Sequence, residues 1–221
     1  MLNVETEAFF ARLPRPILLY LGRISPEKSP QDFLSLRLGG KQHSKVVVGS
    51  ISGGLTLEQL AAIDPSAHFV GVKVGEELAD YVRHCDVLVF PSRTDTFGLV
   101  MLEALASGVR VAARPTIGSR DVITDSSVGC LDEDLEKAVQ TALTLSPEHC
   151  RDFALEQTWE DAVSRFGKLL APCASGKVYS AQERQPWANI PYDQLRQLVF
   201  QTAMMLWSEE PAGPYDPNRP R

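Results

Sequence analysis

Short apolar runs alternate with helical segments over most of this chain, and this alternation constrains the fold more than any other feature. The run Ile17–Leu21 reads ILLYL, which is typical of a strand buried on both faces. Five later runs repeat the pattern, at 45–48, 67–70, 87–90, 109–112 and 128–131. Strands that alternate with helices form a parallel sheet covered on both faces, so we predict an α/β fold with about six parallel strands.

The helical segments indicate where the folded domain ends. Those expected between strands are 30–36, 57–63, 76–83, 99–107 and 119–123, and those expected after the last strand are 135–145, 147–156 and 159–170. Composition changes near Pro172, where Pro, Ser, Gly and Gln become frequent and periodicity is lost. We therefore expect one domain over 15–171, a linker over 172–190 and a tail over 191–221.

The composition excludes several classes of protein. Hydrophobic residues make up 44% of the chain and charged residues 23%, as in soluble globular proteins. The net charge of −6 argues against a broad nucleic-acid surface, which needs clustered Lys and Arg. No apolar run reaches the roughly 20 residues of a membrane span, and the start of the chain lacks the basic region of a signal peptide. We therefore expect a cytoplasmic protein.

Neither the cysteines nor the acidic residues predict a metal site. The four cysteines have no CxxC or other metal-ligand spacing, and Cys85 and Cys130 adjoin apolar runs, so we interpret both as reduced core residues. The acidic triplet 132–134 superficially resembles a metal-binding motif. It directly precedes the helical segment 135–145, where the helix dipole favours carboxylates, so we interpret it as a helix start.

The loop after the first strand carries two cations at an edge of the sheet that is suited to ligand binding. Arg23 and Lys28 follow Ile17–Leu21, and ligands of open parallel sheets bind beyond the carboxyl ends of the strands. An arginine fork and a lysine point charge can together bind a diphosphate. The alternative is a solvated surface loop in which Glu27 balances Lys28, and the spacing alone leaves both interpretations open.

The segment after the fourth strand has the features of an anion site at a helix start. The strand ends at Pro91, a polar turn follows, and Gly98 precedes an apolar helical stretch whose first N–H groups lack helical partners. Glu103 lies one turn into that stretch, where a buried carboxylate needs partners such as ribose hydroxyls. The alternative is that Glu103 caps N–H groups of a neighbouring loop. Asp95, in the turn, is equally compatible with an Asx turn or a helix N-cap.

Together these segments resemble the large retaining glycosyltransferases with two Rossmann-like domains, such as glycogen synthases, sucrose synthases and phosphatidylinositol mannosyltransferases. Gly22, Arg23 and Lys28 match the GR…EK loop of that family, and 158–160 matches the start of its closing helix. The stretch 90–108 matches the PS…ExFGLVxLEAxAxG motif, which is the most specific of the three. Within it, residues 92–98 are most similar to sulfolipid synthases and some bacterial mannosyl- and glucosyltransferases.

The resemblance implies the Rossmann-like C-terminal half of a GT-B architecture, which binds a nucleotide-diphosphate sugar. Arg23 and Lys28 would hold the diphosphate and neutralise charge on the departing nucleotide, so no metal or other cofactor is implied. Glu103 would bind the ribose, and Asp95 would contact the donor sugar. The implied catalytic residues are Arg23, Lys28 and Asp95. The implied donor-binding residues are Arg23, Lys28, Val70, Gly71, Asp95, Thr96, Phe97, Gly98, Leu99, Val100 and Glu103.

Some positions depart from the family pattern. The first carboxylate of the family's acidic pair is usually Glu, and Asp95 is shorter by one methylene, so the resemblance does not imply which sugar is transferred. Arg110 stands where proline is usual, and we expect the change to be tolerated. Residues 49–54 match the family's glycine-rich loop only loosely. Outside this family, other nucleotide-binding Rossmann proteins are disfavoured because no GxGxxG follows the first strand.

Family members are longer and include an acceptor domain, and residues 1–14 resemble the end of the hinge between the two domains. The resemblance therefore implies a donor-binding half, with the acceptor domain in a separate partner protein or in a longer gene product. The alternative is a non-catalytic nucleotide-sugar-binding or scaffold protein. The segment 192–207 has an amphipathic helical pattern and would pack on its own domain or bind that partner. Peripheral membrane contact is not indicated, because Glu209 and Glu210 follow a helix whose single basic residue is Arg196.

Overall fold

The computed structural model describes residues 4–95, 98–158, 160 and 163–164. The chain divides into a compact unit over Met1–Gln157 and a second unit over Thr158–Arg221. The predicted linker and tail, including the amphipathic segment, lie outside the described residues. Of the helix predicted at 159–170, residues 160 and 163–164 are described and are helical.

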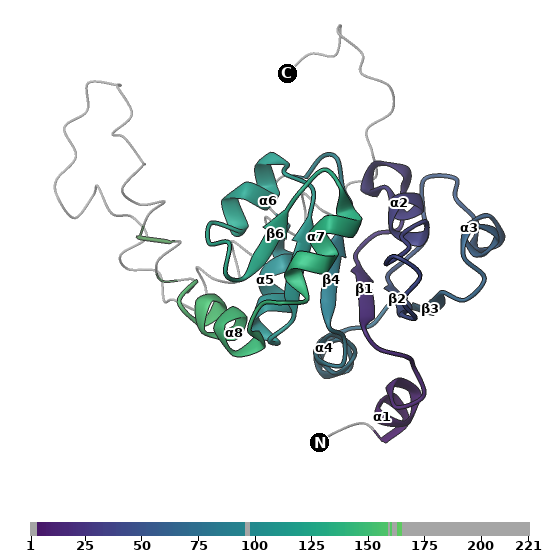
Figure 1. Ribbon diagram of the computed structural model, residues 1–221, viewed down its shortest axis with the longest axis horizontal. Coiled ribbons are helices and arrows are strands. Elements are labelled where there is room, and N and C mark those ends of the chain that lie inside the picture. Colours follow the sequence, from purple (N-terminus) through teal and green to yellow (C-terminus); the bar gives the residue numbers. More distant parts are fainter. Residues whose placement is uncertain (1–3, 96–97, 159, 161–162, 165–221) are drawn as a thin grey trace, which may run out of the picture. The chain divides into compact units, whose positions relative to one another are not determined.

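The first unit contains one sheet of six parallel strands in the order β3-β2-β1-β4-β5-β6 (Figure 1). The strands are β1 (Ile17–Leu21), β2 (Ser44–Val48), β3 (His68–Gly71), β4 (Val87–Phe90), β5 (Arg110–Ala113) and β6 (Gly129–Leu131). The predicted fold class is confirmed, and β1 and β4 have the predicted bounds. The chain starts in the middle of the sheet and extends to both edges, which is the doubly wound topology of Rossmann-like folds.

Helices flank the sheet along the described part of the chain. They are α1 (Val4–Phe10), α2 (Pro30–Leu34), α3 (Leu57–Ile63), α4 (Gly75–Arg83), α5 (Leu99–Ala106), α6 (Ile117–Val122), α7 (Leu135–Ala142) and α8 (Pro147–Leu155), with a 3-10 helix, η1, at Pro26–Lys28. The helices that were predicted begin within about one turn of their expected starts, and several end earlier. The sequence did not predict α1 or η1, because both are too short to show a clear period.

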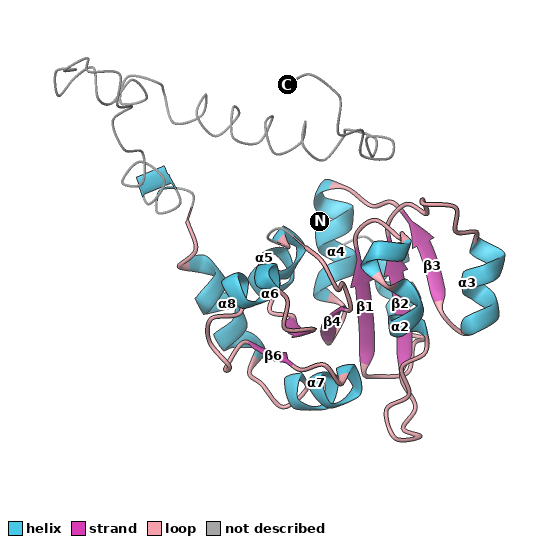
Figure 2. Ribbon diagram, turned by 90° about the horizontal axis from the view of Figure 1, so that it is seen from above, coloured by secondary structure: helices cyan, strands magenta, loops and turns pink. Residues whose placement is uncertain are grey.

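The strands are largely apolar because helices cover both faces of the sheet. On one face, Leu19 and Leu88 belong to a core cluster that includes residues of α1, α4, α5, α6 and α8. On the other face, Leu18 and Val89 belong to a cluster that includes residues of α2, α3 and α7. Figure 2 shows the ribbons of helices on both sides of the sheet. Alternate residues of one strand therefore enter two separate cores.

The N-terminal helix α1 is anchored on the first unit by aromatic residues. Phe10 is 3% exposed, and its ring stacks on His84 with 4.9 Å between the ring centroids. Phe9 meets the edge of His68 on β3 at 5.4 Å. The segment 1–14, which was interpreted as the end of a hinge, therefore contains a helix that packs on this unit.

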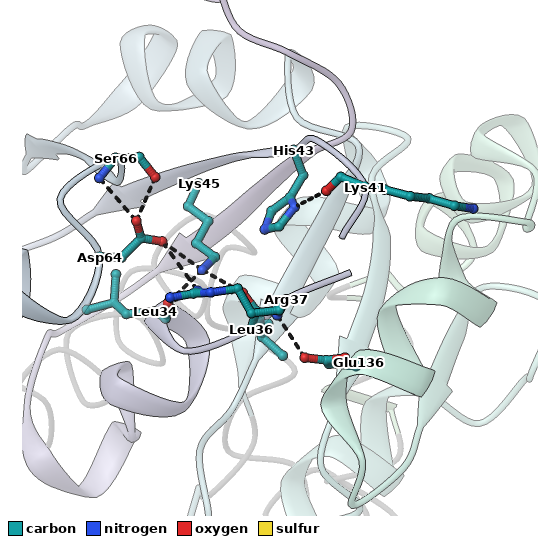
Figure 3. A network of polar contacts seen from close by, with 9 residues as sticks. All are labelled: Leu34, Leu36, Arg37, Lys41, His43, Lys45, Asp64, Ser66 and Glu136. Atoms are coloured by element: carbon teal, nitrogen blue, oxygen red, sulfur yellow. Dashed lines mark hydrogen bonds and ion pairs between the residues drawn. The ribbon is translucent and has the colours of Figure 1, made fainter. Parts of the chain in front are cut away.

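A buried ion pair fixes the C-terminal end of α2 to β2 (Figure 3). Lys45 Nζ donates to the carbonyl oxygens of Leu34 and Leu36 and lies 2.8 Å from Asp64 Oδ2. Burial lowers the pKa of Lys45, and the hydrogen bond to Asp64 opposes that shift. Burial alone would raise the pKa of Asp64, but hydrogen bonds from Lys45 and Ser66 together lower it. Both groups are therefore stabilised as an ion pair.

The structure supports the interpretation of the acidic triplet 132–134 as a helix start. Asp134 is the N-cap of α7 and accepts hydrogen bonds from the backbone N–H groups of Glu136 and Lys137. Over the described ranges, no three His, Cys, Asp or Glu residues form a group that could hold a metal ion. Cys85 is buried and Cys130 is half-buried, and both are free thiols. None of the described helices has the length and apolarity needed to cross a membrane.

Candidate functional site

The strand order reverses between β1 and β4, and this switch point is where ligands of doubly wound sheets bind. Leu18 and Leu19 of β1 pair with Val87 and Leu88 of β4. The loops that leave the carboxyl ends of these two strands therefore start side by side. One loop contains the predicted basic residues and the other contains the predicted acidic turn, so the fold brings together two segments that are distant in sequence.

The loop after β1 is braced by contacts within itself. The buried Tyr20 donates from its hydroxyl to the Arg23 carbonyl oxygen over 2.9 Å. Arg23 Nη2 lies 3.1 Å from Glu27 Oε1, and both side chains are more than a third exposed. Ser25 Oγ donates to the same Glu27 oxygen, and this hydrogen bond lowers the pKa of Glu27. Arg23 is thus paired inside its own loop, with its guanidinium open to solvent.

Lys28 connects this loop to the loop after β4. Its Nζ lies 2.5 Å from Asp95 Oδ2, and the two side chains are 24% and 11% exposed. Water screens a pair at this depth less than it screens a surface ion pair. Two residues predicted as catalytic are therefore in direct contact at the switch point.

Helix α5 begins beside this pair with a left-handed glycine. Gly98, its N-cap, has φ 75° and ψ 54°. A Cβ at this position would lie 2.5 Å from Met101 Cε, so any other residue would crowd the first turn. The N–H groups of Leu99 and Val100 belong to this first turn, where the helix provides them with no acceptor. Thr96 and Phe97 lie outside the described residues, so their donor contacts stay predictions.

Glu103 lies on the outward face of α5. Met101, Ala104 and Leu105 of the same helix are buried, whereas Glu103 is exposed. The expectation of a buried carboxylate is wrong, because Glu103 is on the helix face opposite the apolar stripe. Its carboxylate accepts no hydrogen bond from any described residue, so the loop-capping alternative finds no support. The protein around it still removes part of its hydration, which raises the pKa of Glu103.

Backbone contacts join the loops after β1, β2 and β3. Gly22 N donates to Val48 O over 3.0 Å, and Gly49 N donates to Gly71 O over 2.9 Å. A Cβ on Gly49 would lie 1.8 Å from the carbonyl oxygen of Gly22, so only glycine permits this approach. Val70 and Gly71, which the resemblance places along the base, therefore lie at the same edge of the sheet as Lys28, two strands away from β1.

The sequence did not predict a charged cluster beside the two loops. Arg114 Nη1 lies 2.7 Å from Asp32 Oδ2, and Arg93 Nη2 lies 3.3 Å from the same oxygen. Arg93 follows β4 and Arg114 follows β5, and a cation after a strand is the signal that could have found them. Asp32 carries no comparable signal, because its partners are 61 and 82 residues away in sequence.

An open depression of about 410 Å³ adjoins this cluster. Its lining comes from α2, from the residue after β5 and from the start of α7. The lining residues are Asp32, Ser35, Leu36, Arg114, Glu133, Asp134, Leu135 and Glu136. Four of these are carboxylates and one is a cation, so the depression does not suit a diphosphate. No predicted donor-binding residue lines it.

The comparisons with known proteins agree on one family. Residues 15–146, more than half of the chain, match the family model described as "Glycosyl transferases group 1". Over 117 residues the chain is 37% identical to a GDP-mannose-dependent alpha-mannosyltransferase from Mycobacterium tuberculosis, which covers 53% of this chain and 30% of the relative. The chain spans less than half the length of the curated relatives it matches.

Solved structures show the same fold. Sucrose-phosphate synthase from Thermosynechococcus elongatus is 26% identical with a TM-score of 0.62, over 76% of this chain and 48% of the synthase. The C-terminal domain of a glycosyl transferase group 1 family protein from Francisella tularensis has a TM-score of 0.56 at 21% identity. That match covers 69% of this chain and 91% of the solved domain, and it shows likeness of fold alone.

Proposed function

The chain belongs to the group 1 glycosyl transferases, and we propose that it forms the donor-binding half of a retaining enzyme that transfers a hexosyl group from a nucleotide-diphosphate sugar. The contact between Lys28 and Asp95 is the observation that carries the proposal. It joins the basic loop after β1 to the acidic turn after β4 at the switch point of the sheet. A nucleotide sugar presents a charged diphosphate beside a polar sugar ring, so it needs a cation and a carboxylate in close proximity.

In this proposal, Arg23 and Lys28 provide the positive charge that the donor diphosphate needs. Each now contacts a carboxylate, at 3.1 Å and 2.5 Å respectively. On binding, phosphate oxygens replace those carboxylates as acceptors. Negative charge grows on the departing diphosphate as the bond to the sugar breaks, and two fixed cations stabilise that charge in the transition state. Because side chains supply the charge, the proposal requires no metal ion.

The remaining donor contacts follow from the positions of the other residues. Asp95 gives up its contact with Lys28 and accepts hydrogen bonds from hydroxyl groups of the donor sugar. The N–H groups of Leu99 and Val100 at the start of α5 bind phosphate oxygens. Glu103, exposed on the same helix, accepts hydrogen bonds from the ribose, and a ligand there would provide the donors that the described residues do not.

We further propose that the acceptor is bound by a second domain, provided by a longer polypeptide or by a separate cytoplasmic partner. The chain spans less than half the length of its curated relatives, which leaves room in them for such a domain. Closure of two domains would exclude water from the transferred sugar. Without this second domain, the expected activity of the chain is donor binding.

Titration calorimetry with UDP, GDP, ADP and their sugars tests the proposal. We expect Lys28→Ala and Arg23→Ala each to weaken nucleoside-diphosphate binding by about 1.5–3 kcal/mol, the scale of a charged hydrogen bond. Glu103→Ala is expected to lower affinity for the ribonucleoside without unfolding the domain. Lys41→Ala, which removes an exposed lysine outside the site, is the matched control. Unchanged affinity in both the Lys28 and the Arg23 variants would contradict the diphosphate assignment.

A non-catalytic nucleotide-sugar-binding or scaffold protein is the second candidate, because the charged residues at the switch point would bind a donor whether or not the sugar is then transferred. Turnover separates the two functions. Release of nucleoside diphosphate from a donor sugar, by this chain alone or after mixing with an acceptor-domain protein, supports the enzyme. Tight donor binding without turnover, both by the chain alone and after mixing with an acceptor-domain protein, supports the scaffold.

A further inference from the structure

Helix α2 follows Lys28 directly, so the position of Lys28 depends on how α2 is held. Ser29 links the two with a left-handed turn at φ 49°, and α2 starts at Pro30. The C-terminal end of α2 is fixed to β2 by Lys45, which donates to the carbonyl oxygens of Leu34 and Leu36. The N-terminal end of α2 lies beside Lys28, and a different contact holds that end against the loop after β4.

Asp32 provides this second contact. It lies in the first turn of α2, and its Oδ2 accepts from Arg114 Nη1 at 2.7 Å and from Arg93 Nη2 at 3.3 Å. The same Arg114 Nη1 donates to the carbonyl oxygen of Pro91 over 2.8 Å. Arg93 and Pro91 belong to the loop after β4, which also contains Asp95. One carboxylate therefore ties α2 to the loop that carries the partner of Lys28.

The strength of the contacts that Asp32 makes with Arg114 and Arg93 depends on their burial. The Arg114 side chain is 12% exposed and Asp32 is 34% exposed, whereas Arg93 is 65% exposed. The Arg114 contact is sheltered from water and short, so it contributes more than the Arg93 contact. Without the carboxylate, both arginines would lose the acceptor that Asp32 provides on α2, and they would lie close together as like charges with no shared counter-ion. The loop would then lose this contact with α2.

We propose that Asp32 is a positioning residue of the donor site, which holds Lys28 within reach of Asp95 and of the donor diphosphate by clamping α2 to the loop after β4. Asp32 acts through Arg114 and does not itself contact the donor. The clamp keeps Lys28 in place while the Lys28 ammonium group leaves Asp95 and binds phosphate oxygens instead. This inference rests on the proposed function, because it assumes that Lys28 binds the diphosphate.

A double-mutant cycle tests the clamp with whichever of UDP, GDP or ADP binds the wild-type chain. We expect Lys28→Ala to weaken binding by about 10-fold or more, and Asp32→Asn to weaken it by about 5-fold or more, the scale of coupling between neighbouring charged residues. In the Lys28→Ala background, Asp32→Asn is expected to have no further effect, because the residue it positions is gone. A merely structural role would instead weaken binding equally in both backgrounds.

Two further variants serve as controls, and urea unfolding verifies that every variant is folded. Asp32→Glu keeps the carboxylate and is expected to restore affinity to within about twofold of the wild type. Glu133 is the other carboxylate near Arg114: its Oε2 lies 3.7 Å from Arg114 Nε, and its side chain is 76% exposed. Glu133→Gln is expected to leave binding unchanged.

Each outcome discriminates between the proposals. Wild-type affinity in Asp32→Asn beside weakened binding in Lys28→Ala overturns the clamp and leaves the proposed function standing. Additive losses in the double variant also overturn the clamp. If no nucleoside diphosphate binds the wild-type chain, or if Lys28→Ala binds as tightly as the wild type, the donor site and the clamp fail together.

Discussion

Replacing the buried Lys45 with methionine is expected to destabilise the first unit by about 3 kcal/mol. The Lys45 side chain is 2% exposed. Its Nζ donates to Leu34 O at 2.6 Å, to Leu36 O at 2.9 Å and to Asp64 Oδ2 at 2.8 Å (Figure 3). Methionine retains a chain of similar length, so the substitution removes a charge and three hydrogen bonds while largely preserving the packing.

The magnitude follows from what remains around Asp64. Removing one partner of a buried ion pair costs about 3–5 kcal/mol, because the other charge loses its counter-ion. Asp64 keeps hydrogen bonds from Ser66 N at 3.1 Å and from Ser66 Oγ at 2.6 Å, and Arg37 lies 3.9 Å away. These contacts place the loss at the lower end of the range. Adding Asp64→Asn to Lys45→Met removes the uncompensated carboxylate and is expected to recover about 1–2 kcal/mol.

Urea unfolding followed by circular dichroism gives the free energy of unfolding of each variant. Lys41→Met is the matched control, because Lys41 is an exposed lysine four residues earlier, and it is expected to stay within about 0.5 kcal/mol of the wild type. Equal stability of Lys45→Met and Lys41→Met would refute the reasoning. A double variant less stable than Lys45→Met would show that the uncompensated carboxylate is not the source of the loss.

Two backbone predictions concern the loops of the donor site. Ser29→Gly is expected to raise the free energy of unfolding by about 0.5–1 kcal/mol, because φ 49° is strained for serine, and a loss of stability in urea unfolding would contradict the left-handed turn. Gly49→Ala is expected to lower it by about 2–4 kcal/mol, because its Cβ would meet the carbonyl oxygen of Gly22 at 1.8 Å. Gly54→Ala, at a left-handed glycine with open space around its Cβ, is the control, and an equal loss in both variants would reject the steric argument.

The order and type of the regular elements could be predicted from local pattern. The central strands β1 and β4 appear in the sequence as apolar runs because both of their faces are covered, and Leu18 and Leu19 of β1 enter the two separate cores. The donor segments could be found in the same way, because the ends of parallel strands mark the ligand-binding edge. The helix α1 could not be predicted in this way, because its Phe10 is held by a ring contact with His84, which is distant in sequence.

Side-chain orientation on a helix was harder to predict. Glu103 was expected to be buried because the residues around it in sequence are apolar. The helix faces the core with Met101, Ala104 and Leu105, and the remaining direction leaves Glu103 exposed. Sequence showed a carboxylate in an apolar stretch, and only the packing of α5 against the sheet determined which way it points.

Local sequence was enough to define the strands, the helix starts and the family motifs, because apolar period and turn chemistry act between residues a few positions apart. Tertiary structure alone decided which charges meet. Lys28 and Asp95 are 67 residues apart, and they touch because β1 and β4 are neighbours at the centre of the sheet. Asp32 and Arg114 are 82 residues apart, and the fold likewise brings them together. An ion pair depends on distance in space, so the sequence between its partners does not reveal it.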